Sequence, residues 1–470
     1  MLIPMDTMTA LSWGRAHRGP QEIRRPHWQQ EAGALAASAG PYPRLARGLG
    51  RSYGDSCLNF GGTLIETQQL DRLVAFDREH GLVIADPGLS LFALIDLCLK
   101  PNPDGSYWFP PVVPGTKFVS LGGAIANDIH GKNHHLAGTF GEHIVWLELV
   151  RSDGSLHRCS RAENPALFAA TVGGLGLTGY ISRIALQLQK VSSPLFDVED
   201  VAIGSVLDFW DLAAESAERF AYTAAWIDCL ALGEGLGRGI FSRARHAQTP
   251  PRAIRPPHKP ALNVPFALPG WVLNPVTLRA FNTAYRARLG GPRRMRRGVS
   301  YNHFLFPLDG VGAWNRLYGP RGFFQYQCVV PPSTMRDAIP AMLGRIAATG
   351  QGSFLAVLKT FGPRPAAGLL SFPMEGATLA LDFPNKGTTT LALLDSLDEI
   401  LESAGGRLYP AKDGRMSAAS FQRQYPGWRN FAQYKDPQFS SSFWRRVSGT
   451  GLGQEPIEES PAICVGADNR

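Results

Sequence analysis

The sequence predicts an α+β protein of two domains, and three observations lead to this prediction. The chain has 470 residues, which is too many for one ordinary hydrophobic core. From about Ile65 to Gln189, short strand patterns with tight turns and a few helix patterns between them are typical of the α+β class. After Lys190, aromatic residues and prolines become more frequent, which indicates a second unit.

Local patterns predict the elements of the first unit. An Asp-Gly pair at Asp153 and Gly154 is expected to close a hairpin within the second of three strand regions. These strand regions are 82–88, 143–160 and 179–189. The apolar spacing of two further stretches is typical of short amphipathic helices: 89–100 and 163–172.

In the second unit, strands are expected at 323–330 and 353–362, with a helix at 333–350. The segment 236–298 contains thirteen Lys or Arg and no Asp or Glu, so it makes the whole chain basic, at a formal net charge of +8. Because prolines crowd part of this segment, it is expected to be a basic mobile loop. Residues 450–470 are expected to form a disordered polar tail.

Composition argues against several classes of protein. No apolar run reaches the roughly 18 residues of a membrane span. The N-terminus lacks the basic start and apolar centre of a secretory signal, so a cytoplasmic protein is expected. The cysteines form no CxxC pair and are expected to be reduced thiols. They are Cys57, Cys98, Cys159, Cys229, Cys328 and Cys464.

Two motifs suggest other chemistry, and their context argues against it. The string G-x-G-x-x-G at 174–179 would bind a dinucleotide only between a strand and a following helix, whereas here a helix pattern precedes and a strand pattern follows. His130 and His134 have the spacing of a zinc site, but Gly131 stands where zincins carry Glu, and Gly138 disfavours a helix. A metal-free site is therefore favoured.

Glycine turns are the feature that remains. Because glycine has no side chain, backbone N–H groups at such turns can approach a ligand closely. Concave groups of these N–H groups bind anions such as a pyrophosphate. One glycine turn is explained by tight packing alone, but four close together indicate a large bound cofactor. The four stretches are 46–56, 114–116, 120–131 and 173–179.

The motifs of these turns, with two from the second unit, resemble a known family. In chain order they are "GLGRSYGD", "PGT", "GGAIANDIHGKNHH", "TVGGLGLTG", "FFQYQC" and "GGRLYPAKDGR". They resemble the vanillyl-alcohol-oxidase class of FAD enzymes, which carry a PCMH-type FAD-binding domain, and within it the decaprenylphosphoryl-β-D-ribose 2′-oxidases. The resemblance runs from Trp13 to Arg446.

The resemblance implies how the chain is divided. An FAD domain would comprise 1–191 and a C-terminal return segment, 407–449. A substrate domain built on an antiparallel sheet would be inserted between them, at 192–406.

The resemblance also implies the flavin contacts. They come from the first glycine-rich loop, from two later turns and from two single residues: Arg47, Gly48, Leu49, Gly50, Arg51, Ser52, Tyr53, Gly54, Asp55, Ser56, Gly115, Thr116, Ser120, Leu121, Gly122, Gly123, Asn127, Asp128, Ile129, His130, Ile181 and Tyr409. Some members of the class tether FAD through His or Cys in the first loop. Because Tyr53 stands at the centre of this loop, noncovalent FAD is expected, with Cys57 as the alternative tether.

The reaction implied is oxidation of the ribose 2′-hydroxyl of a polyprenyl phosphate sugar, with hydride passing to flavin. An NAD(P)-dependent short-chain reductase would complete an epimerisation to arabinose for cell-wall or surface glycan synthesis. Lys412 and His130 are the catalytic candidates, and whether Lys412 is a base or an orienting group stays open. The substrate side would be lined by Gln325, Gln327, Lys359 and Trp226.

Two positions depart from the mycobacterial relatives. Ala380 stands where those relatives carry Cys, so this position offers no proton, and covalent inhibitors directed at a thiol should fail. Around Leu305 and Phe306 the relatives carry more polar aromatic residues. The substrate pocket is therefore expected to differ from that of these relatives.

Alternatives remain for the partners and for the activity. The basic segment is expected either to meet an anionic membrane surface, peripherally at the inner membrane, or to be a solvated loop. Nucleic acid is not an expected partner, because no recognised motif accompanies the charge. One alternative is a soluble aldonolactone (D-arabinono-1,4-lactone-type) or alditol oxidase that uses FAD and O2. The other, a non-enzymatic nucleic-acid-binding protein, would take up no FAD.

Overall fold

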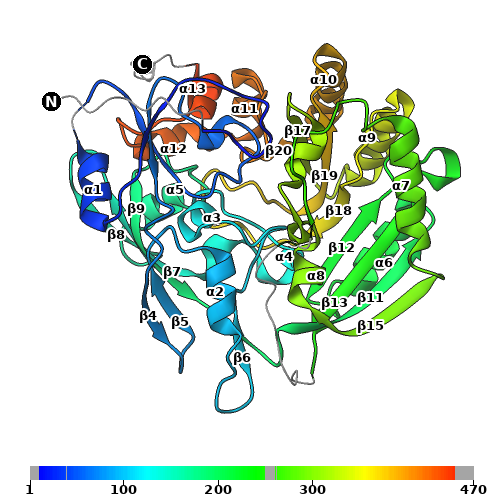
Figure 1. The fold of residues 1–470 in the computed structure, drawn as a ribbon, viewed down its shortest axis with the longest axis horizontal. Helices are drawn as coiled ribbons and strands as arrows, with labels where there is room; N and C mark the ends of the chain where they lie inside the picture. The colour runs from blue at the N-terminus through cyan, green and yellow to red at the C-terminus, as the bar shows by residue number, and fades with distance from the viewer. Residues whose placement is uncertain (1–9, 39, 249–259, 261, 450–470) are drawn as a thin grey trace, which may run out of the picture.

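The computed structural model describes residues 10–38, 40–248, 260 and 262–449. Figure 1 shows two lobes side by side, the first built from N-terminal segments and the second from the middle of the chain. The last helices, drawn in orange and red, lie on the first lobe. The chain therefore leaves the first lobe, builds the second and returns.

The first lobe contains two main sheets. One is parallel, in the order β1-β3-β2: β1 Glu22–Arg24, β2 Arg44–Arg47 and β3 Thr63–Glu66. The other is antiparallel, in the order β4-β5-β9-β7-β8: β4 Leu73–Asp77, β5 Leu82–Ala85, β7 Ile144–Val150, β8 Leu156–Cys159 and β9 Tyr180–Gln187. The predicted hairpin and closing strand are confirmed as β7–β8 and β9.

Serine caps begin two helices of this lobe. The Ser90 hydroxyl accepts from the Ala93 N–H at 3.2 Å before α2 (Leu91–Cys98), and the Ser120 hydroxyl accepts from the Gly123 N–H at 3.3 Å before α3 (Leu121–Ala126). Both helices bury apolar side chains in the core of this lobe. Its other helices are α1 Gln29–Ala37, α4 His134–Ala137 and α5 Pro165–Thr171.

The second lobe is built on an antiparallel sheet. Among the described residues it has eight strands, in the order β15-β11-β13-β12-β18-β19-β17-β20. Their bounds are β11 Leu195–Ile203, β12 Tyr222–Ile227, β13 Gly239–His246, β15 Arg293–Ser300, β17 Phe323–Val330, β18 Ala356–Phe361, β19 Gly376–Pro384 and β20 Arg407–Leu408. Strands β17 and β18 confirm the expectations for 323–330 and 353–362.

One face of this sheet packs under three helices: α6 Val206–Ser216, α9 Met335–Thr349 and α10 Thr388–Ser403. Side chains alternate between the two faces of a strand. In β17, Tyr326 and Cys328 therefore join the core beneath the helices, while Gln325 and Gln327 face the other way. The second face of the sheet is therefore available to form a site.

The return segment is fastened to the first lobe. It contains α11 Ala418–Gln424, α12 Trp428–Tyr434 and α13 Ser442–Ser448. The Arg44 N–H donates to the Gln438 carbonyl at 2.8 Å, and the Ser442 N–H donates to the Leu58 carbonyl at 2.8 Å. The division of the chain at 191/192 and 406/407 stays a prediction.

Smaller elements complete the fold. Two pairs of short strands are β6 Tyr107–Phe109 with β10 Gln189–Val191, and β14 Leu262–Asn263 with β16 Val311–Gly312. The remaining helices are α7 Pro275–Ala287 and α8 Tyr301–Leu305, and the single 3-10 turns are 55–57, 140–143, 233–235, 307–310 and 314–318. No helix in the described part of the chain is long and apolar enough to cross a membrane.

The prediction of a basic mobile loop over 236–298 is wrong where that segment forms β13, α7 and β15. One local cause and one long-range cause account for this difference. The Asn274 side chain caps α7 by accepting from the Val276 and Thr277 N–H groups, and Pro275 stands at the first helical position, where proline is favoured. Strand β15 pairs with β11.

Acidic residues outside the segment offset its charge. On β11, Glu199 pairs with Arg243 at 2.8 Å and with Arg293 at 3.0 Å, and Asp200 pairs with Arg296 at 2.7 Å. A sequence count of the segment alone misses these partners, because β11 precedes it in the chain. Residues 249–259 and 261, and the tail predicted at 450–470, lie outside the described residues.

Candidate functional site

A cavity of about 380 Å³ lies where the glycine turns of the first lobe meet the free face of the second-lobe sheet. Its walls include members of all four glycine stretches singled out in the sequence. The first-lobe wall includes 46–53, Ser56, Cys57, 113–116, Ser120, Gly123, Asn127, 129–132 and Leu175. The second-lobe wall includes Trp226, Ser242, Gln325, Gln327, Lys359, Thr378 and Ala380, and the return segment adds Tyr409, Ala411 and Lys412.

Close backbone packing explains a glycine in the first loop. A Cβ atom at Gly48 would lie 2.0 Å from the Ser120 hydroxyl oxygen, the same oxygen that caps α3. A side chain there would separate the first loop from the α3 turn. The glycine therefore lets two stretches that are distant in sequence form one continuous wall.

Most of the predicted flavin-contact residues line this cavity, but six do not. The six are Gly54, Asp55, Leu121, Gly122, Asp128 and Ile181. Leu121 and Ile181 belong to the apolar core of the first lobe. Asp128 is fully buried and accepts from the Gly141 N–H at 2.8 Å and the Ser371 hydroxyl at 2.5 Å. The side chains of Leu121, Asp128 and Ile181 therefore lie behind the wall of the cavity.

The wall fits a large polar ligand such as FAD. Several buried polar atoms on it have no hydrogen-bond partner within the protein: the Ser56 hydroxyl oxygen, the Arg51 Nε and the His130 Nδ1. Buried polar groups are rarely left unpaired in folded proteins. A ligand with its own donors and acceptors would satisfy these atoms.

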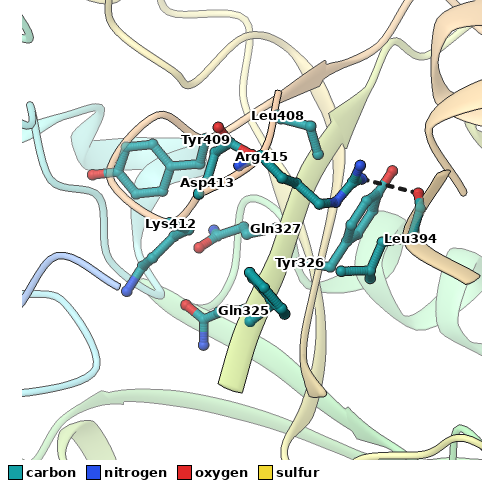
Figure 2. Close-up of a pocket in the computed structure, with 11 residues that line it drawn as sticks. Gln325, Tyr326, Gln327, Leu394, Leu408, Tyr409, Lys412, Asp413 and Arg415 are labelled. Carbon is teal, nitrogen blue, oxygen red and sulfur yellow. Dashed lines mark hydrogen bonds between the residues drawn. The ribbon is translucent and has the colours of Figure 1, made fainter. Parts of the chain in front are cut away.

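Lys412 reaches the cavity from a tight turn of the return segment. Figure 2 shows it beside Gln325 and Gln327 of β17. Its Nζ lies 3.7 Å from the centroid of the Tyr53 ring. Burial lowers the pKa of Lys412 to about 7, against the opposing effect of the Asp382 carboxylate. Near neutral pH, a substantial fraction of this lysine is therefore an uncharged amine that can accept a proton.

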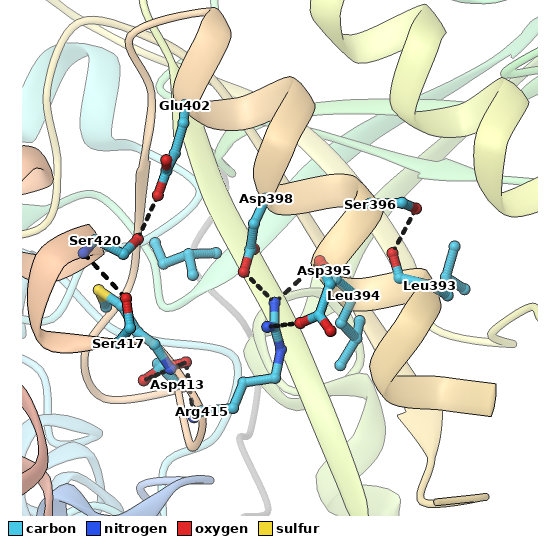
Figure 3. Close-up of polar contacts among 12 residues, drawn as sticks. Leu393, Leu394, Asp395, Ser396, Asp398, Glu402, Asp413, Arg415, Ser417 and Ser420 are labelled. Carbon is cyan, nitrogen blue, oxygen red and sulfur yellow. Dashed lines mark hydrogen bonds and ion pairs between the residues drawn. The ribbon is translucent and has the colours of Figure 1, made fainter. Parts of the chain in front are cut away.

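Ion pairs hold the turn that carries Lys412. Arg415 donates to Asp395 at 2.7 Å and to Asp398 at 2.5 Å on α10, and to the Leu394 carbonyl at 3.0 Å (Figure 3). On the other side of the turn, Arg446 of α13 donates to Asp413 at 3.0 Å and to Asp55 at 2.6 Å.

The Arg446 fork joins the first glycine-rich loop to the Lys412 turn. The Tyr53 N–H donates to the Ala411 carbonyl at 2.9 Å, so the two segments also meet through their backbones. At Gly54, a Cβ atom would lie 1.5 Å from the Asp413 carbonyl oxygen, so only glycine fits this approach. The ion pair and the backbone contacts fix the distance between Tyr53 and Lys412.

His130 lies against aromatic rings and one amide. Its centroid is 5.2 Å from the Tyr409 ring and 4.9 Å from the Phe361 ring, and its Nε2 lies 3.0 Å from the Gln327 amide nitrogen. Burial lowers the pKa of His130 well below its ordinary value, and the charge of Lys359 acts in the same direction. The imidazole is therefore neutral and can orient a ligand, but it is a poor store for a proton.

The remaining predicted substrate residues also face the cavity. Lys359 donates to the Gly131 carbonyl at 3.2 Å, and burial together with the charges of Lys132 and Lys412 lowers the pKa of Lys359 to about 7. The Trp226 indole N–H donates to the Phe354 carbonyl at 3.0 Å. All four members of the set, Gln325, Gln327, Lys359 and Trp226, line the same cavity.

Several lining residues were not predicted. Lys132, in the "DIHGKNHH" string, is half-buried and donates to the Phe304 carbonyl, and burial lowers its pKa to about 8. Its place two residues after the predicted His130 was a usable signal. Tyr285 packs on Trp226 at 4.6 Å, but no local signal could place it, because its helix lies in the segment expected to be a loop. Others not predicted include Trp13, Asp309, Trp314 and Thr378.

The other histidines of the opening cluster make local contacts. His135 and His143 lie 2.9 Å from the carbonyls of Phe220 and Ala137, and His134 packs on Phe361 at 4.3 Å. Within the described residues, no group of three or more His, Cys, Asp or Glu is arranged to hold a metal ion. The string at 174–179 lies between α5 and β9, which is not the strand-to-helix turn of a dinucleotide site.

Comparison with known proteins agrees with this geometry. A protein-family model described as an FAD binding domain matches residues 23–160, which carry three of the four glycine stretches of the wall. The protein is therefore an FAD-dependent oxidoreductase of the PCMH type, and its α+β fold with a large antiparallel sheet is as expected.

Similarity along the whole chain identifies the family within this class. The chain is 35% identical over 461 residues to decaprenylphosphoryl-β-D-ribose oxidase of Mycolicibacterium smegmatis, covering 94% of this chain and 98% of that protein. It belongs to the decaprenylphosphoryl-β-D-ribose oxidase family. An uncharacterized protein of Streptomyces coelicolor is 35% identical over 358 residues, covering 72% of this chain and 96% of that protein. A putative D-arabinono-1,4-lactone oxidase of Neurospora crassa is 28% identical over only 125 residues, covering 26% of this chain and 21% of that protein.

Proposed function

We propose that this enzyme oxidises the 2′-hydroxyl of a polyprenylphosphoryl-β-D-ribose to the 2′-keto compound. Similarity along 94% of the chain to an oxidase named for that substrate class is the observation that carries the proposal. The cavity supports it, because Lys412, Gln325 and Lys359 stand opposite the glycine-rich wall. In this proposal 1–191 and 407–449 form the FAD domain and 192–406 the substrate domain.

The glycine-rich wall would hold FAD, with Ser56, Arg51 and His130 as the side chains whose unpaired atoms the ligand satisfies. When bound, FAD supplies the acceptor for the hydride that leaves the sugar carbon. The protein must then orient the reacting C–H bond and take up the hydroxyl proton. Noncovalent binding is part of the proposal, since burial raises the pKa of the Cys57 thiol and so disfavours its reactive thiolate.

Lys412 is the proposed acceptor of that proton. Its pKa of about 7 makes the free amine available near neutral pH, and its nitrogen lies 3.7 Å from the centroid of the Tyr53 ring. His130, neutral and packed on Tyr409, orients the ligands from the other side. Lys412 either removes the proton or orients the hydroxyl by a hydrogen bond. The pH dependence of kcat/KM distinguishes these two roles.

A lipid-linked substrate must reach this cavity from a membrane surface. The second lobe exposes Leu262, Phe266, Trp271 and Val276, with exposed fractions between 64% and 75%. Arginines lie on the α7 and β15 elements that follow. Exposed apolar side chains beside cationic ones are typical of surfaces that bind anionic lipid. We therefore place the enzyme peripherally at the inner membrane, on its cytoplasmic side.

The keto product would be reduced by a separate NAD(P)-dependent short-chain reductase. Reduction from the opposite face inverts the carbon and yields the arabinose compound, so the two steps give a net epimerisation.

A substrate comparison tests the proposal. Purified FAD-loaded protein is incubated with a polyprenylphosphoryl-β-D-ribose and an artificial electron acceptor, and in parallel with free aldonolactones and alditols under O2. Turnover of the lipid-linked ribose with formation of a ketone is the expected result. Turnover of free sugars with peroxide release, and none of the lipid-linked ribose, would instead establish the aldonolactone or alditol oxidase reading.

A further inference from the structure

A buried carboxyl group lies just behind the substrate wall and has no place in the mechanism so far. Asp382 of β19 is 0% exposed and does not line the cavity. Among the described residues, no Lys, Arg or His forms an ion pair with it. Burial raises the pKa of Asp382 to about 7, while its hydrogen bonds and the charge of Lys412 favour the ionised form.

Two side chains donate these hydrogen bonds. Gln325 stands directly opposite Asp382 in the β17·β19 register, and its amide nitrogen donates to Asp382 Oδ1 at 2.6 Å. The Tyr318 hydroxyl donates to Asp382 Oδ2 at 3.3 Å, and the Tyr318 ring stacks on Phe323 at 4.2 Å. The Asp382 N–H donates to the Ser353 hydroxyl at 3.2 Å, which fixes the backbone at this point.

The carboxylate determines which way the Gln325 amide faces. In its ionised form, which predominates above about pH 7, Asp382 accepts hydrogen bonds and donates none, whereas an amide carries donors on one side and an acceptor on the other. Because the NH2 group of Gln325 is directed to Asp382, its carbonyl oxygen is directed away, into the cavity that Gln325 lines. In Figure 2 the Gln325 oxygen lies on the side of Lys412.

An acceptor at this position complements the rest of the wall. The nearby Lys132, Lys359 and Lys412 side chains carry donors when charged. A sugar hydroxyl has a hydrogen of its own to donate, so a wall of donors alone would leave that hydrogen unpaired.

We propose that Asp382 is a positioning residue, which locks Gln325 so that its carbonyl oxygen accepts a hydrogen bond from the ribose hydroxyl next to the one oxidised. The identity of the sugar in this inference rests on the proposed function. The lock, by which the Asp382 carboxyl group fixes the direction of the Gln325 amide, does not depend on it. A site built to bond a hydroxyl rejects the analogue that lacks it far more strongly than an apolar pocket would. Gln325 would therefore determine selectivity for a sugar with a free neighbouring hydroxyl.

The first measurement tests the lock without substrate. Glutamine side chains are labelled with 15N in the FAD-loaded protein, and the Gln325 signal is identified by its loss in Gln325→Ala. In the wild type, exchange of this NH2 group with solvent should be at least about tenfold slower than for exposed glutamines. In Asp382→Asn its resonance should shift, because the carboxylate acceptor is gone. A Gln325 signal that exchanges like an exposed amide and is unchanged in Asp382→Asn would overturn the lock.

The second measurement is a double-mutant cycle on substrate selectivity. The ratio of kcat/KM for polyprenylphosphoryl-β-D-ribose over its 3-deoxy analogue is compared in the wild type, Asp382→Asn, Gln325→Ala and the double variant. Asp382→Asn should reduce this ratio by about tenfold, and should have no further effect in the Gln325→Ala background. An equal effect of Asp382→Asn in both backgrounds would show a general structural role and overturn the proposal.

Tyr318→Phe is the matched control, since it removes the other hydrogen bond of the same carboxylate and leaves Gln325 in place. It should keep the wild-type ratio. If the wild type does not oxidise the lipid-linked ribose at all, the proposed function fails, and the exchange measurement still decides whether Asp382 orients Gln325.

Discussion

The Lys412 ammonium nitrogen lies 3.7 Å from the centroid of the Tyr53 ring, although Tyr53 belongs to the first glycine-rich loop and Lys412 to the return segment. The cavity is therefore closed by two ends of the chain. A cation over an aromatic face is stabilised by the ring, while burial favours the neutral amine. Burial lowers the pKa of Lys412 to about 7, and the charge of the Asp382 carboxylate opposes this shift.

Replacing Lys412 should abolish most of the activity and leave FAD bound. In Lys412→Ala the hydroxyl proton has no acceptor, so kcat should fall by at least about 100-fold, the usual contribution of a positioned acid or base. The flavin absorption spectrum of the purified variant measures FAD content, and a stopped-flow assay measures flavin reduction. Full activity in Lys412→Ala would contradict the assignment.

The pH dependence should follow the free amine of Lys412. If Lys412 accepts the proton, kcat/KM rises with pH and levels off above about 7, because the protonated form below its pKa cannot accept. The Asp382 charge raises the pKa of Lys412, so in Asp382→Asn this rise should move to lower pH. A profile that is flat between pH 5 and pH 9, roughly the range in which such a group titrates, would favour an orienting lysine.

The Arg446 fork should be needed for both stability and cofactor binding. In Arg446→Ala, the buried carboxylates of Asp55 and Asp413 lose their shared cation, which should lower the free energy of unfolding by about 3 kcal/mol. FAD affinity should fall as well, because the first loop is no longer tied to the Lys412 turn. Arg423→Ala is the control: its pair with Glu402 is largely exposed, so urea unfolding should detect a change below about 1 kcal/mol.

A cysteine introduced at position 380 should create sensitivity to thiol-directed inhibitors. Ala380 lines the cavity opposite Gln327 in the β17·β19 register, so its side chain faces bound ligands. The wild type should resist such compounds, since burial raises the pKa of the nearby Cys57 thiol and disfavours the reactive thiolate. Mass spectrometry should detect one covalent adduct in Ala380→Cys and none in the wild type. An adduct on Cys57 of the wild type would disprove this expectation.

Lipid binding should depend on the exposed tryptophan of the second lobe. Trp271 is 75% exposed in the protein. Trp271→Ser should weaken binding to phosphatidylglycerol vesicles by about tenfold, because the indole area that would be buried in the lipid is lost. Trp28, 56% exposed on the first lobe, provides the matched control, and Trp28→Ser should bind as the wild type does. Vesicle sedimentation measures both. Equal loss in the two variants would argue against a specific membrane-facing surface.

Much of the local structure could be predicted from the chain. The alternation in "FFQYQCVV" indicated a strand, and the structure places Gln325 and Gln327 on one face and Tyr326 and Cys328 on the other. The Asp-Gly turn predicted the β7–β8 hairpin. These features depend on residues close in sequence, whose periodicity and turn chemistry determine their conformation.

Only the tertiary structure decided how the site is assembled. Because β11 precedes the basic segment in the chain, a local charge count missed the acidic partners of Arg243, Arg293 and Arg296. The prolines of the segment predicted a loop where strands and a helix form. The pairing of Asp382 with Gln325, and the approach of Gly54 to the Asp413 carbonyl, join segments far apart in the chain.

The glycine turns were enough to point to a cofactor site, and the family resemblance of the "YPAKDGR" string pointed to Lys412. The pKa of that lysine and the direction of the Gln325 amide were not accessible in the same way. Both depend on burial and on charges brought close by folding, and a linear pattern contains neither quantity.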